Sequence, residues 1–194
     1  MLSFEEIKKH VIGKLTKGLS PELTYHNVSH TMDVLKHVME IAEQEGIENE
    51  EELLLLKVSV LYHDVGFLNL YSGHEEISCT VAKEELPQFG FSPEQIEKVC
   101  GMIRATRVPQ QPKTKLEEIL CDSDLDYLGR NDFFEIGAGL YKEFLDQKII
   151  NNDREWNLLQ VRFLENHHYF TQTSKACREK LKQMNLEKVK EKLV

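Results

Sequence analysis

Histidine and aspartate residues gather in three short segments that lie far apart in the sequence. These segments are residues 25–30 (YHNVSH), 61–66 (LYHDVG) and 121–124 (CDSD). Imidazole nitrogens and carboxylate oxygens together form a mixed ligand set that suits divalent metal ions. His63 and Asp64 directly follow an apolar run, where an unpaired carboxylate would be costly to bury and a metal ion would remove that cost. The three segments together therefore predict a metal site.

The first and third segments supply the remaining ligand candidates. His26 and His30 are four residues apart, so on a helix they share one face, and His30 can meet the His-Asp pair if the two helices pack together. For the last carboxylate we favour Asp124, which lies in an apolar stretch, and keep Asp122 as the alternative. We expect one divalent ion, Mn²⁺, Fe²⁺, Co²⁺, Ni²⁺, Zn²⁺ or Mg²⁺, with positions left for water and a substrate oxygen. A water bound there would have its pKa lowered enough to supply hydroxide near neutral pH.

Helical periodicity of apolar residues recurs along almost the whole chain, and strand-like alternation is scarce. The start signals predict helices that begin near residues 3, 20, 25, 50, 74, 92, 114, 132, 153 and 174. Those beginning at 25 and 50 are expected to stop near Gly46 and at Gly66, and the last two to cover 153–168 and 174–192. We find no repeat and no linker. We therefore expect one all-α domain over residues 1–194, a helical bundle whose motif core spans about 21–129, with the C-terminal helices of 153–194 packed on it.

Composition narrows the classes of partner and compartment. The chain has 194 residues with 24 Lys plus Arg against 33 Asp plus Glu, a net charge of −9, which argues against a nucleic-acid polymer or a membrane surface as partner. No apolar stretch approaches the roughly 20 residues that span a bilayer. The acidic, amphipathic start of the sequence does not resemble a signal peptide, so we expect a cytoplasmic protein. The four cysteines, which we expect to be buried free thiols, are Cys79, Cys100, Cys121 and Cys177.

The motifs, in the order H…HD…D with the opening Y-H-N-x-x-H and the ending D-x-D-L-D, resemble the HD-domain superfamily of metal-dependent phosphohydrolases. The resemblance implies an all-α bundle and a set of four metal ligands, which are His30, His63, Asp64 and Asp124. The opening motif is also similar to that of the cyclic-nucleotide phosphodiesterases, and this similarity implies that His26 lies at the phosphate as general acid. A histidine suits that task because its pKa lies near neutral pH.

The sequence also resembles a subgroup of uncharacterised bacterial HD proteins in three further segments, residues 73–78 (GHEEIS), 102–106 (MIRAT) and 163–168 (FLENHH). This resemblance implies a fold and a metal but no substrate. His74 could face the metal cavity and contact a phosphate or a second metal, or it could be an exposed residue in the first turn of a helix. Arg104, Arg107 and Lys113 are candidate phosphate partners, since arginine suits a bidentate contact. We interpret the His167-His168 pair as structural because no metal-binding spacing surrounds it.

Three functions from different classes follow. The first is a metal-dependent phosphohydrolase or phosphodiesterase, with His26 and Asp64 as catalytic residues, acting on a small phosphorylated substrate such as a nucleotide. The second is a di-iron oxygenase on the same scaffold, which needs more histidines than His74 between the HD pair and the final aspartate. The third is a non-catalytic module that binds a metal or a nucleotide. Apolar positions on the terminal helices also permit a homodimer.

Overall fold

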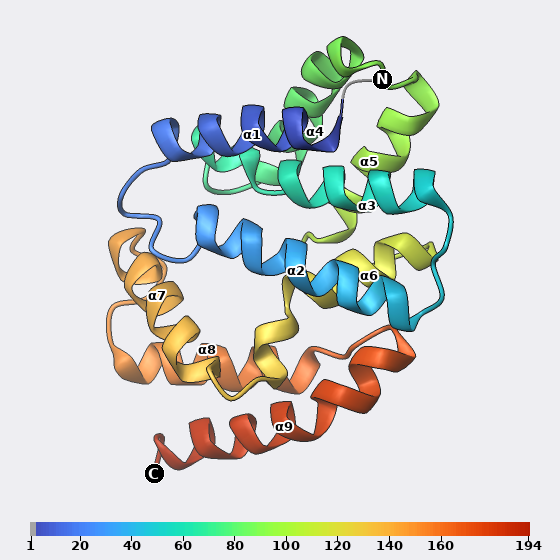
Figure 1. The fold of residues 1–194 in the computed structure, drawn as a ribbon. Coiled ribbons are helices and arrows are strands. Elements are labelled where there is room, and N and C mark those ends of the chain that lie inside the picture. The colour runs from blue at the N-terminus through green and yellow to red at the C-terminus, as the bar shows by residue number, and fades with distance from the viewer. Residues whose placement is uncertain (1–2) are drawn as a thin grey trace.

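The structure, a computed structural model, describes residues 3–194, which form α-helices and short 3-10 helices without any strand (Figure 1). The elements are α1 (Phe4–Gly18), α2 (Val28–Gln44), α3 (Glu50–Tyr62), η1 (Val65–Leu68), α4 (His74–Glu85), η2 (Leu86–Phe89), α5 (Pro93–Ala105), α6 (Lys115–Asp124), η3 (Asp126–Gly129), α7 (Phe133–Asp146), α8 (Asp153–Asn166) and α9 (Gln172–Glu191). The predicted all-α fold is confirmed.

Three of the predicted helix starts, at residues 3, 92 and 114, are N-caps in the structure. Ser3 and Ser92 form capping boxes with Glu6 and Gln95, and the Thr114 side chain accepts a hydrogen bond from the Glu117 N–H. Such caps satisfy backbone N–H groups that have no partner inside the helix. Local sequence therefore determines where these helices begin.

The predicted helix start at residues 20–22 is wrong, and the next helix begins later than expected. Ser20 heads a turn instead, in which the Leu23 N–H donates to the Ser20 carbonyl at 3.0 Å. The chain then reaches Asn27, whose side chain caps α2 by accepting from the Ser29 and His30 N–H groups. His26 therefore lies in the loop before α2 rather than on the helix.

The central helix α3 ends at Tyr62, four residues before the predicted end at Gly66. The Ser78 hydroxyl of α4 donates to the His63 carbonyl at 2.7 Å and accepts from the Gly66 N–H at 2.8 Å, so a side chain takes the place of the next helical hydrogen bonds. A Cβ atom on Gly66 would collide with the His74 backbone. This close approach fixes the start of α4 against the HD motif.

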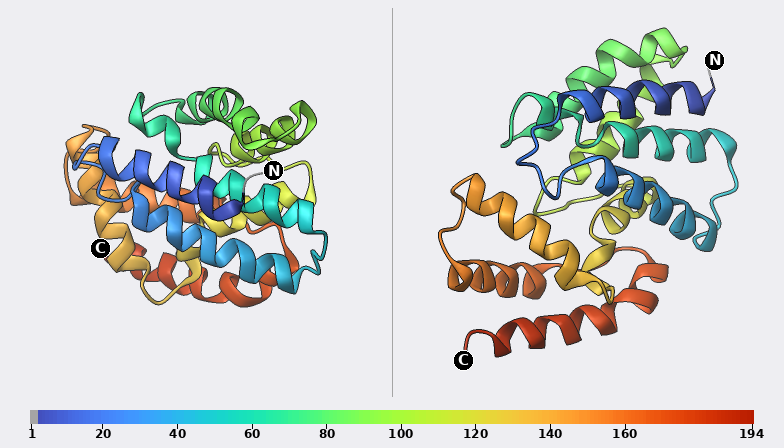
Figure 2. Two further views of the ribbon diagram at one scale, coloured as in Figure 1. Left: turned by 45° about the horizontal axis from the view of Figure 1, so that its top comes forward. Right: turned by 60° about the vertical axis from the view of Figure 1, so that its left-hand side comes forward.

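Two hydrophobic clusters divide the bundle. The larger joins α1 to α6 around α3, whose central residues Leu55, Leu56 and Val58 are buried on several sides, as its apolar composition predicts. The smaller joins the loop before α2 to η3, α7, α8 and α9. Figure 1 shows α1, α3 and α2 stacked above one another, with α7, α8 and α9 below them and the two chain ends far apart; Figure 2 shows the same layers from two further directions.

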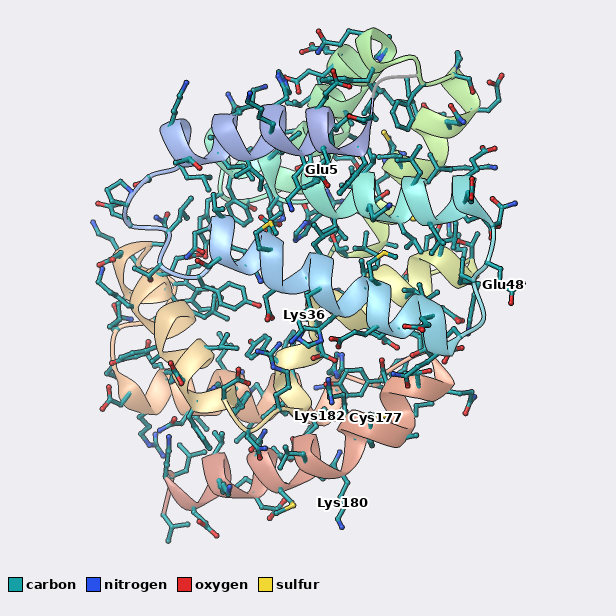
Figure 3. All side chains as sticks on the ribbon, viewed as in Figure 1. Glu5, Lys36, Glu48, Cys177, Lys180 and Lys182 are labelled. Atoms are coloured by element: carbon teal, nitrogen blue, oxygen red, sulfur yellow. The ribbon has the colours of Figure 1, made fainter. Side chains whose placement is uncertain are left out.

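Two further sequence interpretations need correction. Cys79, Cys100 and Cys121 are buried free thiols as predicted, but Cys177 is exposed because it lies on the solvent side of α9 (Figure 3). Asp132 occupies the N-cap position of α7 without capping it, since its carboxylate pairs with Arg130 at 2.6 Å.

Within residues 3–194, no helix has both the length and the apolar character that crossing a membrane requires.

Candidate metal centre

Three helices bring the motif histidines and aspartates to one point. His30 lies in the first turn of α2, oriented by the Asn27 cap, and His63 is the C-cap of α3. Asp64 follows directly, and Asp124 is the last residue of α6. The packing of α2 against both α3 and α6 therefore assembles residues that are nearly a hundred positions apart.

The donor atoms of these side chains are spaced as ligands of one ion are. His30 Nε2 lies 3.4 Å from His63 Nε2 and 3.2 Å from Asp124 Oδ1, and these three donors lie within 4.8 Å of one another. Asp64 Oδ2 lies 3.2 Å from His63 Nε2 and 3.5 Å from His30 Nε2. Two atoms that each lie about 2.0–2.2 Å from one ion are separated from each other by distances like these donor-to-donor distances. The residues present thus fit a divalent metal ion.

Two observations support this fit. Asp64 Oδ2 is buried and has no hydrogen-bond partner among the described residues, an arrangement that a cation would satisfy. His63 Nδ1 lies 2.7 Å from the Val60 carbonyl, which can only accept, so the neutral ring carries its hydrogen on Nδ1 and directs Nε2 toward the other donors. This tautomer is the one that can bind a metal through Nε2.

The electrostatics of Asp64, Asp124 and His63 are those of a site that favours charged carboxylates. Burial by itself raises the pKa of Asp64, but the neighbouring His63 and His74 outweigh it and hold the pKa well below the ordinary value. The pKa of Asp124 is likewise lowered, against burial, by His30 and His63. Burial would lower the pKa of His63, yet the two aspartates raise it. Both carboxylates are therefore ionised at neutral pH and available to a cation.

The geometry favours Asp124 over Asp122 as the ligand. Both oxygens of Asp122 accept hydrogen bonds from the segment before α9: Oδ1 from the Phe170 N–H at 2.9 Å, and Oδ2 from the Thr171 N–H at 2.8 Å and its hydroxyl at 2.6 Å. Its carboxylate therefore ties α6 to the N-terminus of α9 and faces away from His30 and His63.

His26 is held by Glu143, a residue of α7 that sequence analysis did not single out. Glu143 is fully buried; it accepts from the Tyr25 and His26 N–H groups at 3.0 Å, from the Tyr71 hydroxyl at 2.8 Å and from His26 Nδ1. Burial raises the pKa of Glu143, but His26 and the backbone donors lower it by more than that. The net pKa is below the ordinary value, so the carboxylate is charged. Since Nδ1 is engaged, Nε2 of His26 is the ring nitrogen left for a ligand. A carboxylate at an apolar-stripe position of its helix, three residues after Leu140, was the sequence signal available.

His74 faces the metal centre, one of the two alternatives that sequence left open. Its Nε2 lies 3.4 Å from Asp64 Oδ1, the oxygen that does not face His30 and His63. The Phe67 ring stacks on both His74 and His26, with ring centroids 3.9 Å and 4.2 Å away. Burial lowers the pKa of His74 while Asp64 raises it, with a net rise. The two histidines thus stand side by side at the edge of the donor set.

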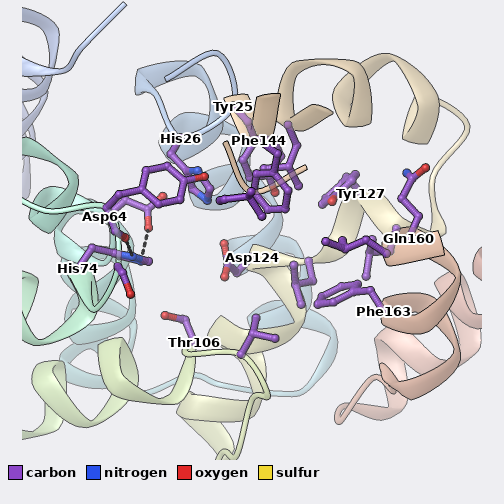
Figure 4. A pocket seen from close by; sticks show the side chains of 18 of the residues that line it. Tyr25, His26, Asp64, His74, Thr106, Asp124, Tyr127, Phe144, Gln160 and Phe163 are labelled. Carbon is purple, nitrogen blue, oxygen red and sulfur yellow. Dashed lines mark hydrogen bonds and ion pairs between the residues drawn. The ribbon is translucent and has the colours of Figure 1, made fainter. Parts of the chain in front are cut away.

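A cavity of about 520 Å³ begins at this edge (Figure 4). His26, Asp64, His74 and Asp124 form its polar end, and the remainder is lined by side chains of α7 and α8 together with residues of η3 and of neighbouring loops. The labelled side chains in Figure 4 surround an open space between these two ends. The position of the cavity allows a molecule bound in it to reach the donor set directly.

The predicted phosphate-binding cations lie elsewhere. Arg104 is on the solvent side of α5, paired with Glu76 at 3.2 Å, and Lys113 is exposed in the loop before α6. Arg107 is half exposed and lies 3.5 Å from Glu75, a residue that does line the cavity. The structure does not bring Arg104 or Lys113 to the site: the Arg104 guanidinium pairs with Glu76 of α4, and the backbone N–H of Lys113 donates to the Glu117 carboxylate while the residue stays exposed.

The His167-His168 pair is remote from the donor set and forms no metal cluster among residues 3–194. The Lys182 ammonium lies 3.5 Å from His167 Nδ1 and donates to the His167 carbonyl at 2.6 Å. Burial, with Lys182 nearby, lowers the pKa of His167 to about 3, so the ring is neutral. These contacts agree with the structural role expected from the sequence.

The fold and the donor set define a helical bundle with a His-His-Asp centre, and comparison with known proteins agrees. The family model of the HD domain matches residues 27–127, which is more than half of the chain. The protein therefore belongs to the HD domain family.

Among solved structures, the chain is similar to the crystal structure of a predicted HD superfamily hydrolase from an uncultured Thermotogales bacterium, determined at 1.45 Å resolution. The TM-score is 0.63 at 20% sequence identity, and the alignment covers 95% of this chain and 90% of the other. This similarity shows that the fold is shared. None of the curated proteins matches the chain.

Proposed function

We propose that the protein is a metal-dependent hydrolase of phosphoric esters. The observation that carries the proposal is the donor set of His30, His63 and Asp124, with the orphaned Asp64 oxygen beside it, at the mouth of a cavity. Membership of the HD domain family supports it. A bound divalent ion supplies Lewis-acid stabilisation of phosphate charge and a lowered pKa for water.

The roles of the chain's own residues follow from their positions. His30, His63, Asp64 and Asp124 hold the ion. His26, oriented through Nδ1 by Glu143, presents Nε2 to the substrate and donates a proton to the departing oxygen. The substrate is a nucleotide or another small phosphate ester.

The direct test is calorimetric titration of Mn²⁺ into chelator-stripped protein. We expect about one ion per chain, lost in Asp124→Ala and retained in Asp122→Asn, whose carboxylate is engaged with the start of α9. Two ions per chain would contradict the single-ion proposal and assign His74 to a second ion. No binding at all would overturn the proposed metal centre.

Turnover is tested next on a panel of nucleotides and phosphate esters. Asp64→Ala is expected to abolish hydrolysis while the circular dichroism spectrum stays helical. Retained turnover in that variant would contradict the mechanism. A wild-type protein that binds the metal and nucleotides tightly, yet releases no product over a long incubation, would instead be a binding module.

A further inference from the structure

The cavity at the metal centre has two chemically different ends. At one end lie the donor set, His26 and His74; at the other, α7 and α8 contribute a wall of apolar side chains. This wall is made by Leu140, Phe144, Trp156, Leu159, Phe163 and Leu164. The amide of Gln160 is the polar group among them (Figure 4). A ligand that fills the cavity must therefore be polar where it meets the donor set and apolar beyond it.

The cavity lacks the cations that a polyphosphate requires. Neither lysine nor arginine is among the residues that line it, and three of its lining residues, Asp64, Glu75 and Asp124, are acidic. Arg107, which does not line the cavity, lies 3.5 Å from the carboxylate of Glu75, which does. Bound phosphate groups are normally neutralised by basic side chains or metal ions. A phosphate at the donor set would be neutralised by the bound ion. No lysine or arginine lines the cavity to neutralise a second or third phosphate along it.

Combining these two properties, and resting on the proposed function, we infer that the substrate is an ester of a single phosphate with an apolar aromatic group. The phosphate lies at the donor set beside His26 and His74, and the aromatic group lies against the wall that α7 and α8 contribute. A volume of about 520 Å³ is in the range of small-molecule sites and is ample for a bicyclic aromatic group with its phosphate. Val108 and Ile149, two of the exposed large apolar residues of the described chain, also line this cavity and extend the apolar surface to solvent.

The chain contains a built-in reporter for this inference. Trp156 is its single tryptophan and lines the apolar end, so intrinsic fluorescence reports occupancy of that end without any turnover. The probes are naphthylmethylphosphonate, which cannot be hydrolysed, and methylphosphonate, which carries the same charged group without the ring. Both are titrated into the Mn²⁺-loaded protein.

We expect naphthylmethylphosphonate to shift the Trp156 emission and to bind at least ~30-fold more tightly than methylphosphonate, because the ring transfers apolar surface out of water. Leu159→Asp places a charge at the apolar end and should weaken the aryl probe at least ~10-fold. The matched control is Leu158→Asp: Leu158 is a half-buried neighbour on α8 that does not line the cavity, so this variant should bind the aryl probe as the wild type does. Equal affinity for the two phosphonates, or equal loss in both variants, would overturn the inference.

Kinetics separate this inference from the proposed function. With 1-naphthyl phosphate, adenosine monophosphate and adenosine triphosphate as substrates, we expect kcat/KM to be highest for the naphthyl ester and at least ~10-fold lower for the triphosphate. A preference for either nucleotide would overturn the inference while supporting hydrolysis. Tight binding of the aryl phosphonate with no turnover of any ester would overturn the proposed hydrolase and leave the assigned binding preference of the cavity standing.

Discussion

At the scale of single residues, the site depends as much on the groups that orient its side chains as on the ligands themselves. Asn27 aims α2 so that His30 reaches the donor set, and the Val60 carbonyl fixes the tautomer of His63. Glu143 does the same for His26 from another helix. Such partners set which ring nitrogen is available, and a ligand list alone omits them.

The role of Glu143 can be tested by Glu143→Gln. The amide retains the size of the side chain but removes the charged acceptor that orients His26 through Nδ1, so we expect kcat to fall roughly 100-fold with little change in KM. Steady-state kinetics on a phosphate ester measure this, because losing the orientation of His26 lowers kcat and leaves substrate binding in place. Mn²⁺ stoichiometry by calorimetry should be unchanged.

The matched control is Glu135→Gln, which alters an exposed glutamate of the same helix. It should leave kcat at the wild-type value. If Glu143→Gln lost only folding stability, with kcat unchanged, Glu143 would be a structural residue and would not position His26.

At the scale of elements, charged side chains connect the two halves of the bundle. Arg130, which follows η3, pairs with Asp33 of α2 at 2.7 Å and with Asp132 at 2.6 Å, and its Nη1 lies 2.8 Å from His37 Nε2. Asp122 links α6 to α9, because its carboxylate accepts a hydrogen bond from the N–H of Thr171, the N-cap of α9. These contacts join helices that hydrophobic packing alone places in separate clusters.

The contact of α2 with Arg130 predicts a pH dependence of stability. Burial raises the pKa of Asp33, but His37 and Arg130 outweigh it and lower the pKa to about 2, below the unfolded value of about 3.9. The stabilisation is therefore fully present above about pH 4 and is lost as the pH falls through about 2. Because the Asp33 side chain is 36% exposed, we expect only about 1 kcal/mol from it at neutral pH.

Urea unfolding of the wild type and of Asp33→Asn at pH 7 and at about pH 2 measures this contribution. The difference between the two proteins should be about 1 kcal/mol at pH 7 and should vanish near pH 2. Glu48→Gln, which alters an exposed residue before α3, serves as control and should unfold like the wild type at both values. A difference that does not depend on pH would contradict the assignment.

At the scale of the whole molecule, the donor set lies where three helices meet, so metal binding and folding should be linked. The proposed ligands come from α2, the end of α3 and α6, and the unfolded chain does not hold them together. Mn²⁺ at about 100 times its dissociation constant should add about 2.7 kcal/mol to the free energy of unfolding. For a domain of this size, that corresponds to a rise in Tm of roughly 5–10 °C.

Calorimetric unfolding with Mn²⁺ and with chelator measures this rise. Asp124→Ala should unfold at the same temperature in both conditions, while Asp122→Asn should keep the metal-dependent rise even though its own stability is lower. An equal response of all three proteins would indicate that the ion binds outside the donor set. The homodimer stays a prediction; on α9 the large apolar residue that is exposed is Met184.

The sequence by itself determined the helical class, most helix starts and the identity of the metal-ligand candidates, because periodicity, caps and the H…HD…D order are local signals. It misplaced the turn at residues 20–22 and the end of α3, since Ser78 from another helix supplies the hydrogen bonds that end it. Only the tertiary structure removed Asp122 as the alternative to Asp124, turned His74 toward the donor set and left Arg104 at the surface. It also brought Glu143 to His26 and built the apolar end of the cavity. These depend on how helices pack against one another, and residue spacing along one chain carries no record of which helix faces which.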